Sequence, residues 1–191
     1  MYKMCNTQLG GVPARAALST AVADLAIFYT KSERERGSIR VFNGLGEVRA
    51  AVGEHLGYSE YQVVTQGDID AFAALTGDDQ WIHTDPVRAA DGPFGTTVAH
   101  GLLTLSLGPR HAKSIYRIDG MTASVNYGYD KIRFPVPVPV PVDSKIRVGA
   151  VISSVTDVPG GAQIGITFTW EVEGKAKPAC VAEMLIRSLA P

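Results

Sequence analysis

The sequence predicts an α+β fold in which an antiparallel sheet wraps around a long central helix. Residues before Gly120 show mainly helical patterns, whereas four extended segments after Gly120 are rich in β-branched and aromatic residues. A strongly apolar helix begins near Val98 and is the natural axis of such a core. The chain has 191 residues, 46% of them apolar and 19% charged, which suits one domain with or without an appendage.

The charge balance argues against nucleic acid or an anionic membrane surface as the partner. The formal net charge is −1, and the pI of about 6.4 indicates no basic field over the molecule. We therefore expect a small-molecule substrate. The two cysteines, Cys5 and Cys180, form neither a disulfide framework nor a metal-spaced set, which favours a reducing, cytoplasmic location.

Residues 1–38 differ from the rest and are predicted to be an N-terminal extension or accessory helix with a linker. Apolar residues recur there at helical spacing, at Leu18, Val22, Leu25 and Phe28. Arg15 and Asp24 interrupt this pattern and argue against a transmembrane span, and the segment is a poor secretory signal. We expect the segment to be an accessory helix or an upstream extension from a misassigned start, outside the active site. The main domain is predicted to cover residues 39–191.

The first half of the main domain is predicted to contain short elements that hold a loop. Residues 44–53 have helical spacing, and residues 61–65 are typical of a short strand. Thr65 can cap the next helix, which Gly77 ends. That helix delivers Asp78 to a turn.

The central helix follows a second capped segment. Asp85 and Pro86 suit the N-cap and first position of a brief helical turn. The helix that begins near Val98 carries four leucines, Leu102, Leu103, Leu105 and Leu107. It is apolar nearly all round, so we expect it to be buried. Pro109 removes a helical hydrogen bond, so we expect a kink or break there before the helix resumes through Tyr116.

Four extended segments follow, at residues 121–134, 145–156, 163–172 and 180–189. We interpret them as four consecutive antiparallel strands, because glycine-containing turns separate the later ones. The Pro-Val repeat at 135–142 lacks alternate backbone donors and is predicted to be an extended polyproline-like connector or edge.

Residues suited to chemistry concentrate between Thr76 and Leu107. Asp78 and His83 lie close together in the chain, on a segment irregular enough to direct both side chains into one cavity. The approach to the apolar helix contains glycine, and the first N–H groups of that helix have no intrahelical partner. Such a helix start attracts an oxyanion or a polarised carbonyl.

These motifs resemble one known family. The segments are Thr76-Gly77-Asp78, Ile82-His83 and Ala99-His100-Gly101, followed by strands. At this spacing they resemble the MaoC-like (R)-specific enoyl-CoA hydratases of the hot-dog fold. Within that family, the Gly-Asp-Asp-Gln-Trp-Ile-His segment and Asn126-Tyr127-Gly128 resemble the nodulation-protein-N-like branch. The resemblance covers about residues 40–190. It implies a homodimer with sites where two subunits meet, and an acyl-CoA or acyl-carrier-protein thioester as ligand.

Carried over to this sequence, the family pattern implies Asp78 and His83 as the water-holding acid/base pair and the Gly101 N–H as oxyanion donor. The implied reaction is (R)-specific hydration of trans-2-enoyl thioesters to 3-hydroxyacyl thioesters, or the reverse dehydration. The chain departs from the pattern at Gln80-Trp81, where many hydratases have Asn-Pro. We expect Trp81 either to wall the acyl tunnel or to anchor the loop, and a large aromatic residue favours the anchor.

Other interpretations stay open at this stage. Asp78 could accept backbone hydrogen bonds in its turn, with His83 as a structural histidine. A hot-dog thioesterase would release free CoA, and a non-catalytic acyl-CoA-binding module would bind thioester without turnover. We interpret His100 as a residue that packs beside the site or supports the reacting groups from behind, because the role implied by the family belongs to the next amide, that of Gly101. We predict no metal, since the usual ligand spacing is missing, and no cofactor.

Overall fold

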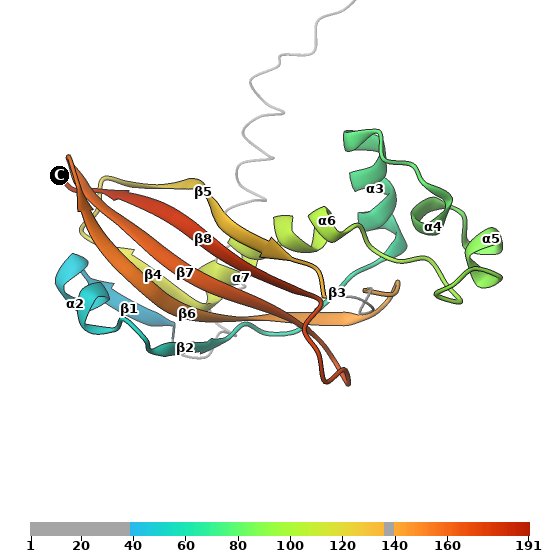
Figure 1. Ribbon diagram of the computed structural model, residues 1–191, viewed down its shortest axis with the longest axis horizontal. Coiled ribbons are helices and arrows are strands. Elements are labelled where there is room, and N and C mark those ends of the chain that lie inside the picture. Colours follow the sequence, from blue (N-terminus) through green and yellow to red (C-terminus); the bar gives the residue numbers. More distant parts are fainter. Residues whose placement is uncertain (1–38, 136–139) are drawn as a thin grey trace, which may run out of the picture. The chain divides into compact units, whose positions relative to one another are not determined.

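The computed structural model describes residues 39–135 and 140–191 (Figure 1). The described part forms one compact unit, Ile39–Pro191. Its helices are α2 (Leu45–Ala50), α3 (Gln66–Thr76), α4 (Trp81–Thr84), α5 (Pro86–Ala90), α6 (Gly101–Ser106) and α7 (Gly108–Ile115). Its strands are β1 (Arg40–Asn43), β2 (His55–Tyr58), β3 (Gln62–Val63), β4 (Tyr116–Asp119), β5 (Ala123–Arg133), β6 (Lys145–Val158), β7 (Gly161–Val172) and β8 (Cys180–Leu189).

Six strands form one antiparallel sheet, in the order β2-β6-β7-β8-β5 with β3 also paired to β6. The four strands expected after Gly120 are therefore confirmed as β5 to β8. The first of them, β5, does not pair with β6, its neighbour in sequence. It pairs with β8 instead, so β5 lies at the far edge of the sheet. Figure 1 shows these strands as long, curved arrows.

The core lies between the sheet and the helices α6 and α7. Its largest fully buried side chains include Trp170, Phe168 and Phe42. Alternate residues of β7 are buried, as expected for a strand with one face toward the core. Hydrogen bonds through Ser59 also connect α7 to the sheet. Ser59 Oγ lies 2.8 Å from Nδ1 of His111 in α7, and it accepts the N–H of Val148 in β6 at 3.0 Å.

The expected central helix is two helices. Helix α6 ends at Ser106, and α7 begins at Gly108 with Pro109 in its first turn. The break is thus confirmed, and packing adds a reason for it. A Cβ at residue 108 would lie 2.8 Å from the Trp170 ring, so only glycine lets the chain pass over this core side chain.

Two details of the central helix were predicted wrongly. It begins at Gly101 and not near Val98, because Val98 forms an antiparallel bridge with Pro141. It is also not buried all round, since Leu102 is 58% exposed while Leu103 and Leu105 are buried. When a helix has apolar residues on all sides, its sequence does not show which face is exposed to solvent or to another subunit.

The helix before the turn forms as predicted. The Thr65 side chain accepts the Asp68 N–H at 3.2 Å, and the Asp68 carboxylate accepts the Thr65 N–H at 2.9 Å, which makes a reciprocal cap of α3. Gly77 ends the helix at a φ of 75°, the left-handed region that glycine adopts without strain. Asp78 follows directly in the turn.

Two predicted segments fall wholly or partly outside the described residues. The helix and linker expected in residues 1–38 lie outside them, as do residues 136–139 of the Pro-Val repeat. The described end of that repeat is extended, because Val140 O accepts the Ala99 N–H at 2.8 Å and Val142 N–H donates to Thr97 O at 3.0 Å. Within the described ranges, no helix has both the length and the apolar character needed to cross a membrane.

Candidate active site

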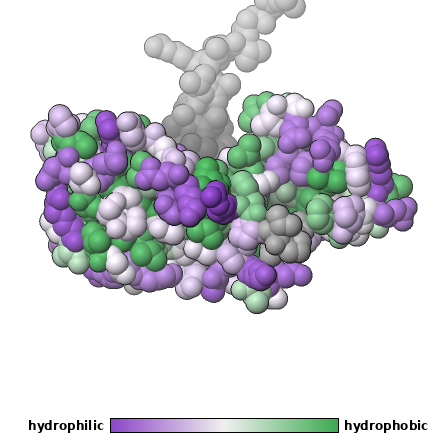
Figure 2. Space-filling model, viewed as in Figure 1, coloured by the Kyte–Doolittle hydropathy of each residue, from purple (hydrophilic) through white to green (hydrophobic). Residues whose placement is uncertain are grey.

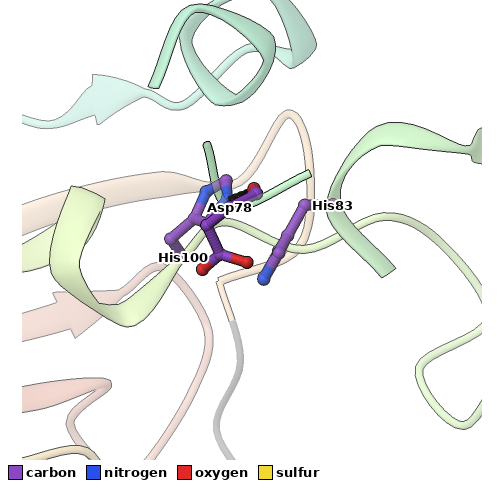
Figure 3. Close-up of side chains that lie close together, drawn as sticks. All are labelled: Asp78, His83 and His100. Carbon is purple, nitrogen blue, oxygen red and sulfur yellow. Dashed lines mark hydrogen bonds between the residues drawn. The ribbon is translucent and has the colours of Figure 1, made fainter. Parts of the chain in front are cut away.

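Three side chains from the predicted stretch come together at one point. A carboxylate oxygen of Asp78 and one ring nitrogen each of His83 and His100 lie within 4.8 Å of one another (Figure 3). Asp78 is exposed, whereas His83 and His100 are 9% and 3% exposed. The cluster therefore has a carboxylate facing solvent and two imidazoles behind it.

The Asp78 carboxylate is not engaged in its own turn. Its backbone N–H lies 3.4 Å from Thr76 Oγ1, and its backbone oxygen accepts a hydrogen bond from His100. Among the residues that the structure describes, no backbone N–H donates to the carboxylate. This differs from the purely structural role considered for Asp78, in which the side chain would accept backbone hydrogen bonds.

His83 is fixed by hydrogen bonds at both its ring and its backbone. Its Nδ1 donates to Val98 O at 2.6 Å, and its backbone oxygen accepts from Gln66 Nε2 at 2.8 Å. A carbonyl oxygen only accepts, so Nδ1 carries the hydrogen of the neutral ring and Nε2 keeps its lone pair. The geometry thus leaves His83 Nε2 as the atom able to take up a proton.

The extended segment 97–100 aligns the whole cluster. Thr97 Oγ1 donates to Gln66 Oε1 at 2.6 Å, and through that amide it is linked to the His83 backbone. Val98 uses both of its backbone groups, because its N–H donates to Ile82 O at 3.0 Å while its oxygen accepts from His83. A short run of backbone therefore sets the position of α4, which carries His83.

Gly101 is the first residue of α6 and follows His100 directly. Its N–H has no acceptor within the helix, because the first four N–H groups of any helix lack one. A Cβ at this position would lie 3.1 Å from the Phe134 ring, closer than most Cβ contacts. Glycine therefore lets the ring pack against the backbone here, while residue 101 stays exposed to solvent. The three predicted site residues thus belong to one continuous region.

Trp81 lies in α4, and its contacts are with α5 and the turn that follows α5. The Arg88 guanidinium lies 4.5 Å from its ring centroid. A Cβ at Gly92 would lie 2.8 Å from the ring, so the indole packs directly on the Gly92 backbone. These contacts join α4 to α5 and agree with the expectation that Trp81 anchors the loop.

Sequence reasoning missed Gln66 and understated His100. Gln66 reaches His83 and Thr97 from the first turn of α3, far away in the chain. His100 donates from Nε2 to Asp78 O at 2.8 Å and stacks on the His83 ring. No spacing rule predicts the Gln66 contacts, whereas the position of His100 directly before Gly101 was a usable signal.

The three clustered side chains are also of the types that hold a divalent metal. His83 Nδ1 and His100 Nε2 already donate to backbone oxygens, which leaves one nitrogen on each ring. The expectation that the protein uses no metal stays a prediction.

A separate cavity of about 320 Å³ lies along α7, away from the cluster. It is lined by Pro109, Ala112, Lys113, Tyr116, Arg117, Ile118, Ser124, Asn126, Phe168, Met184 and Ile186. Its wall thus combines one side of α7 with β4 and three strands of the sheet. Most of these side chains are apolar, so the cavity suits an apolar group.

An antiparallel sheet packed around a helix is the arrangement of the hot-dog class of proteins. R-Hydratase PhaJ1 from Pseudomonas aeruginosa, solved in its unliganded form, superposes with a TM-score of 0.59 at 21% sequence identity. The match covers 73% of this chain and 83% of that one. It confirms the expected fold.

The chain belongs to the family described as MaoC like domain, whose model matches residues 47–164. The 3-hydroxyacyl-thioester dehydratase Z of Mycobacterium tuberculosis is 47% identical over 153 residues, which are 80% of this chain and 100% of the relative. Nodulation protein N of Rhizobium leguminosarum bv. viciae is 39% identical over 147 residues, 74% of this chain and 88% of that protein. Both resemblances noted in the sequence are confirmed.

Proposed function

We propose that the protein adds water to trans-2-enoyl thioesters to give (R)-3-hydroxyacyl thioesters, and catalyses the reverse dehydration. Asp78 and His83 hold and activate the water, and the Gly101 N–H binds the thioester oxygen. The observation that carries this proposal is the approach of the Asp78 carboxylate to the His83 ring beside the first N–H of α6.

The chemistry follows from the hydrogen bonds of the cluster. His83 Nε2 has a free lone pair, so it takes one proton from water while the Asp78 carboxylate accepts a hydrogen bond from the O–H that remains. The water oxygen bonds to C3, and the C2–C3 double bond becomes single as charge moves onto the thioester oxygen. The Gly101 N–H stabilises that charge, and the proton on His83 then passes to C2.

The expected rate losses are large enough for the removal of either kind of group to be detected in an assay. A positioned acid/base group is typically worth about 10² to 10⁴ in rate, and one oxyanion donor about 10² to 10³. The relative that shares 47% identity is named for dehydration of 3-hydroxyacyl thioesters, which is the same equilibrium in the opposite direction. That name supports a thioester as the ligand of this chain.

The acyl group of the substrate requires an apolar compartment, whereas the reacting atoms require the polar cluster. We propose that the thioester carbonyl lies at Gly101 and that the chain extends beside α6 toward the cavity along α7. Because Asp78 is exposed at the surface, a thioester carried by either CoA or an acyl-carrier protein can reach the cluster.

The shared sites implied by the family also lead us to propose a homodimer. Strand β5 is an edge of the sheet, and it exposes Val125 and Tyr127. A second copy paired at this edge would cover both side chains and continue the sheet.

The test is a hydration assay with trans-2-enoyl-CoA substrates of increasing chain length, followed by chiral analysis of the product. We expect loss of the conjugated enoyl thioester and formation of the (R)-3-hydroxyacyl product. Release of free thiol without 3-hydroxyacyl product would instead assign a thioesterase. Saturable binding with neither product would assign a binding module and reject the proposal.

A further inference from the structure

His100 contacts both members of the proposed acid/base pair. Its Nε2 donates to the backbone oxygen of Asp78 at 2.8 Å. Its ring stacks on the His83 ring, with centroids 3.7 Å apart and planes at 25°. Figure 3 shows His100 beside Asp78 and His83, with the hydrogen bond to Asp78 drawn.

The surroundings of His100 hold its ring in place. It is 3% exposed, and it also meets the Phe72 ring of α3 at a centroid distance of 5.1 Å. Its backbone is the N-cap of α6, so the residue that follows is Gly101. A single side chain therefore contacts the segments that carry Asp78 and His83, and its backbone leads into the proposed oxyanion donor.

Packing alone does not account for a histidine here. Within the described residues, its buried Nδ1 has no hydrogen-bond partner. Leaving a buried polar atom unpaired is unfavourable, and an apolar ring would fill the space next to Phe72 without that cost. The hydrogen bond from Nε2 to Asp78 is what an apolar ring cannot supply.

We propose that His100 is a positioning residue that fixes Asp78 and His83 relative to each other for the water-addition step. This inference rests on the proposed function for its effect on rate. Its geometric part, a lock between the Asp78 backbone and the His83 ring, stands on the contacts alone. Displacing a reacting group by about 1 Å can cost about 10²-fold in rate, so loss of this lock should lower kcat more than it changes KM.

Two substitutions separate the two contacts. His100→Phe keeps a ring against His83 and removes the donor to Asp78, and we expect kcat to fall by up to about 10²-fold with KM changed little. His100→Gln keeps a side-chain N–H donor and removes the ring. We expect the kcat of His100→Gln to lie between those of His100→Phe and the parent protein. The restored hydrogen bond should raise kcat by roughly a factor of 10 or less, the usual contribution of a neutral hydrogen bond.

His111→Gln is the matched control, since His111 is also buried but lies in α7 outside the cluster. Burial lowers the pKa of His111 to about 4, so this control replaces a neutral ring. We expect it to shift the melting temperature without lowering kcat. A fall in kcat equal to that of the folded His100 variants would overturn the proposal, as would His100 variants with parental kcat.

Nuclear magnetic resonance tests the lock without an assay. We expect His100→Gln to remove the ring-current shift on the His83 ring protons, and His100→Phe to move the Asp79 amide signal, which reports on the Asp78 carbonyl. Unchanged signals in both variants would refute the positioning role. If the parent protein shows no hydration, the proposed function fails, while these signals still decide whether His100 positions the pair.

Discussion

Asp78 and His83 are constrained in different ways. His83 is buried and hydrogen-bonded at its ring and its backbone, so its orientation is set by the fold. Asp78 is exposed, and its backbone oxygen is held while its carboxylate faces solvent. A fixed imidazole next to an accessible carboxylate is suited to the proposed role of holding one water molecule against a substrate that enters from solution.

The first prediction removes each member of the pair. Asp78→Asn and His83→Ala should each lower the hydration rate by about 10² to 10⁴, because each removes an acid/base contribution. Asp79→Asn is the matched control, as this exposed neighbour lies outside the cluster. Circular dichroism must show intact folds. Near-parental turnover in both folded variants would exclude the pair from the mechanism.

Trp81 provides the second prediction at this scale. Its contacts with Arg88 and Gly92 hold α4 against α5 and the turn after it, so Trp81→Ala should destabilise the fold by about 1–3 kcal/mol, as expected for a partly buried side chain. Because α4 carries His83, turnover should then fall alike for every acyl chain length. Thermal unfolding and a chain-length series measure both effects. A variant of unchanged stability with a shifted chain preference would make Trp81 a wall of the acyl tunnel.

The sequence predicted Asp78, His83 and Gly101 because all three lie in one short stretch with a recognisable spacing. It did not predict Gln66, whose side-chain amide bridges Thr97 and the His83 backbone. Those partners become neighbours only when α3 packs beside segment 97–100. Side-chain hydrogen bonds across such distances in the chain leave no periodic pattern in the sequence.

At the level of elements, long and strongly patterned segments were predictable, and short ones were not. The four long strands and the capped helix α3 follow from their residue patterns. Strands β1 and β4 were missed, because four-residue strands are too short to show alternation. They pair in parallel as a separate two-stranded sheet, from Arg40 beside Tyr116 to Asn43 beside Asp119.

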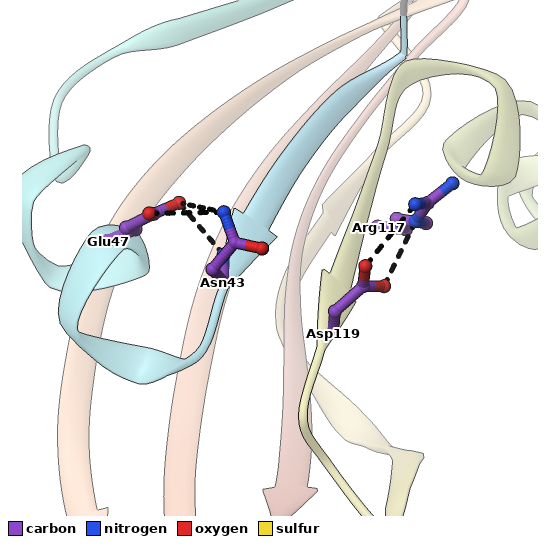
Figure 4. A network of polar contacts seen from close by, with 4 residues as sticks. All are labelled: Asn43, Glu47, Arg117 and Asp119. Atoms are coloured by element: carbon purple, nitrogen blue, oxygen red, sulfur yellow. Dashed lines mark hydrogen bonds and ion pairs between the residues drawn. The ribbon is translucent and has the colours of Figure 1, made fainter.

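Local polar contacts mark the end of this small sheet. Glu47 accepts the Asn43 N–H at 2.8 Å, and Arg117 pairs with Asp119 at 3.0 Å (Figure 4). The Asn43 backbone hydrogen bond, together with its side-chain amide, lowers the pKa of the Glu47 carboxyl. The Asn43–Glu47 contact spans the turn from β1 into α2, and the Arg117–Asp119 pair lies within β4; both are exposed, so each contributes little to stability.

The cavity along α7 gives a prediction at the element scale. If the acyl chain extends into it, Ala112→Leu should fill part of the space and lower kcat/KM for long enoyl chains while sparing short ones. Each methylene that loses its place is worth roughly 1–3 kcal/mol of discrimination. Arg110→Ala, at an exposed position of the same helix that does not line the cavity, tests whether any change in α7 has this effect. An equal loss for all chain lengths would place the acyl chain elsewhere.

For the whole molecule, the main domain is predicted to work without residues 1–38. The Mycobacterium tuberculosis relative is matched along 100% of its length by 80% of this chain, so the match to that relative does not use the remaining fifth. Deleting residues 1–38 should leave a soluble, active protein, compared with the full chain in the same assay. Loss of activity with the oligomeric state unchanged would show that this segment contributes to the site.

The edges of the sheet determine how copies of the molecule can meet. Strand β5 pairs with β8 on one side only, and its eleven residues are mostly exposed. Figure 2 shows apolar and polar residues interleaved on the surface in view. Val125 and Tyr127 are 51% and 55% exposed on this free edge strand, and an exposed edge with apolar side chains favours pairing with another strand.

The last prediction is that pairing at the β5 edge makes the dimer and completes the site. Light scattering should show a dimer, and Tyr127→Lys should shift it toward monomer, because like charges would meet across the paired edges. Leu75→Lys is the matched control, since Leu75 is 85% exposed on α3, away from this edge. Hydration should fall together with the dimer. A monomeric parent with full activity would reject the shared site, and a dimer unaffected by Tyr127→Lys would place the interface on another surface.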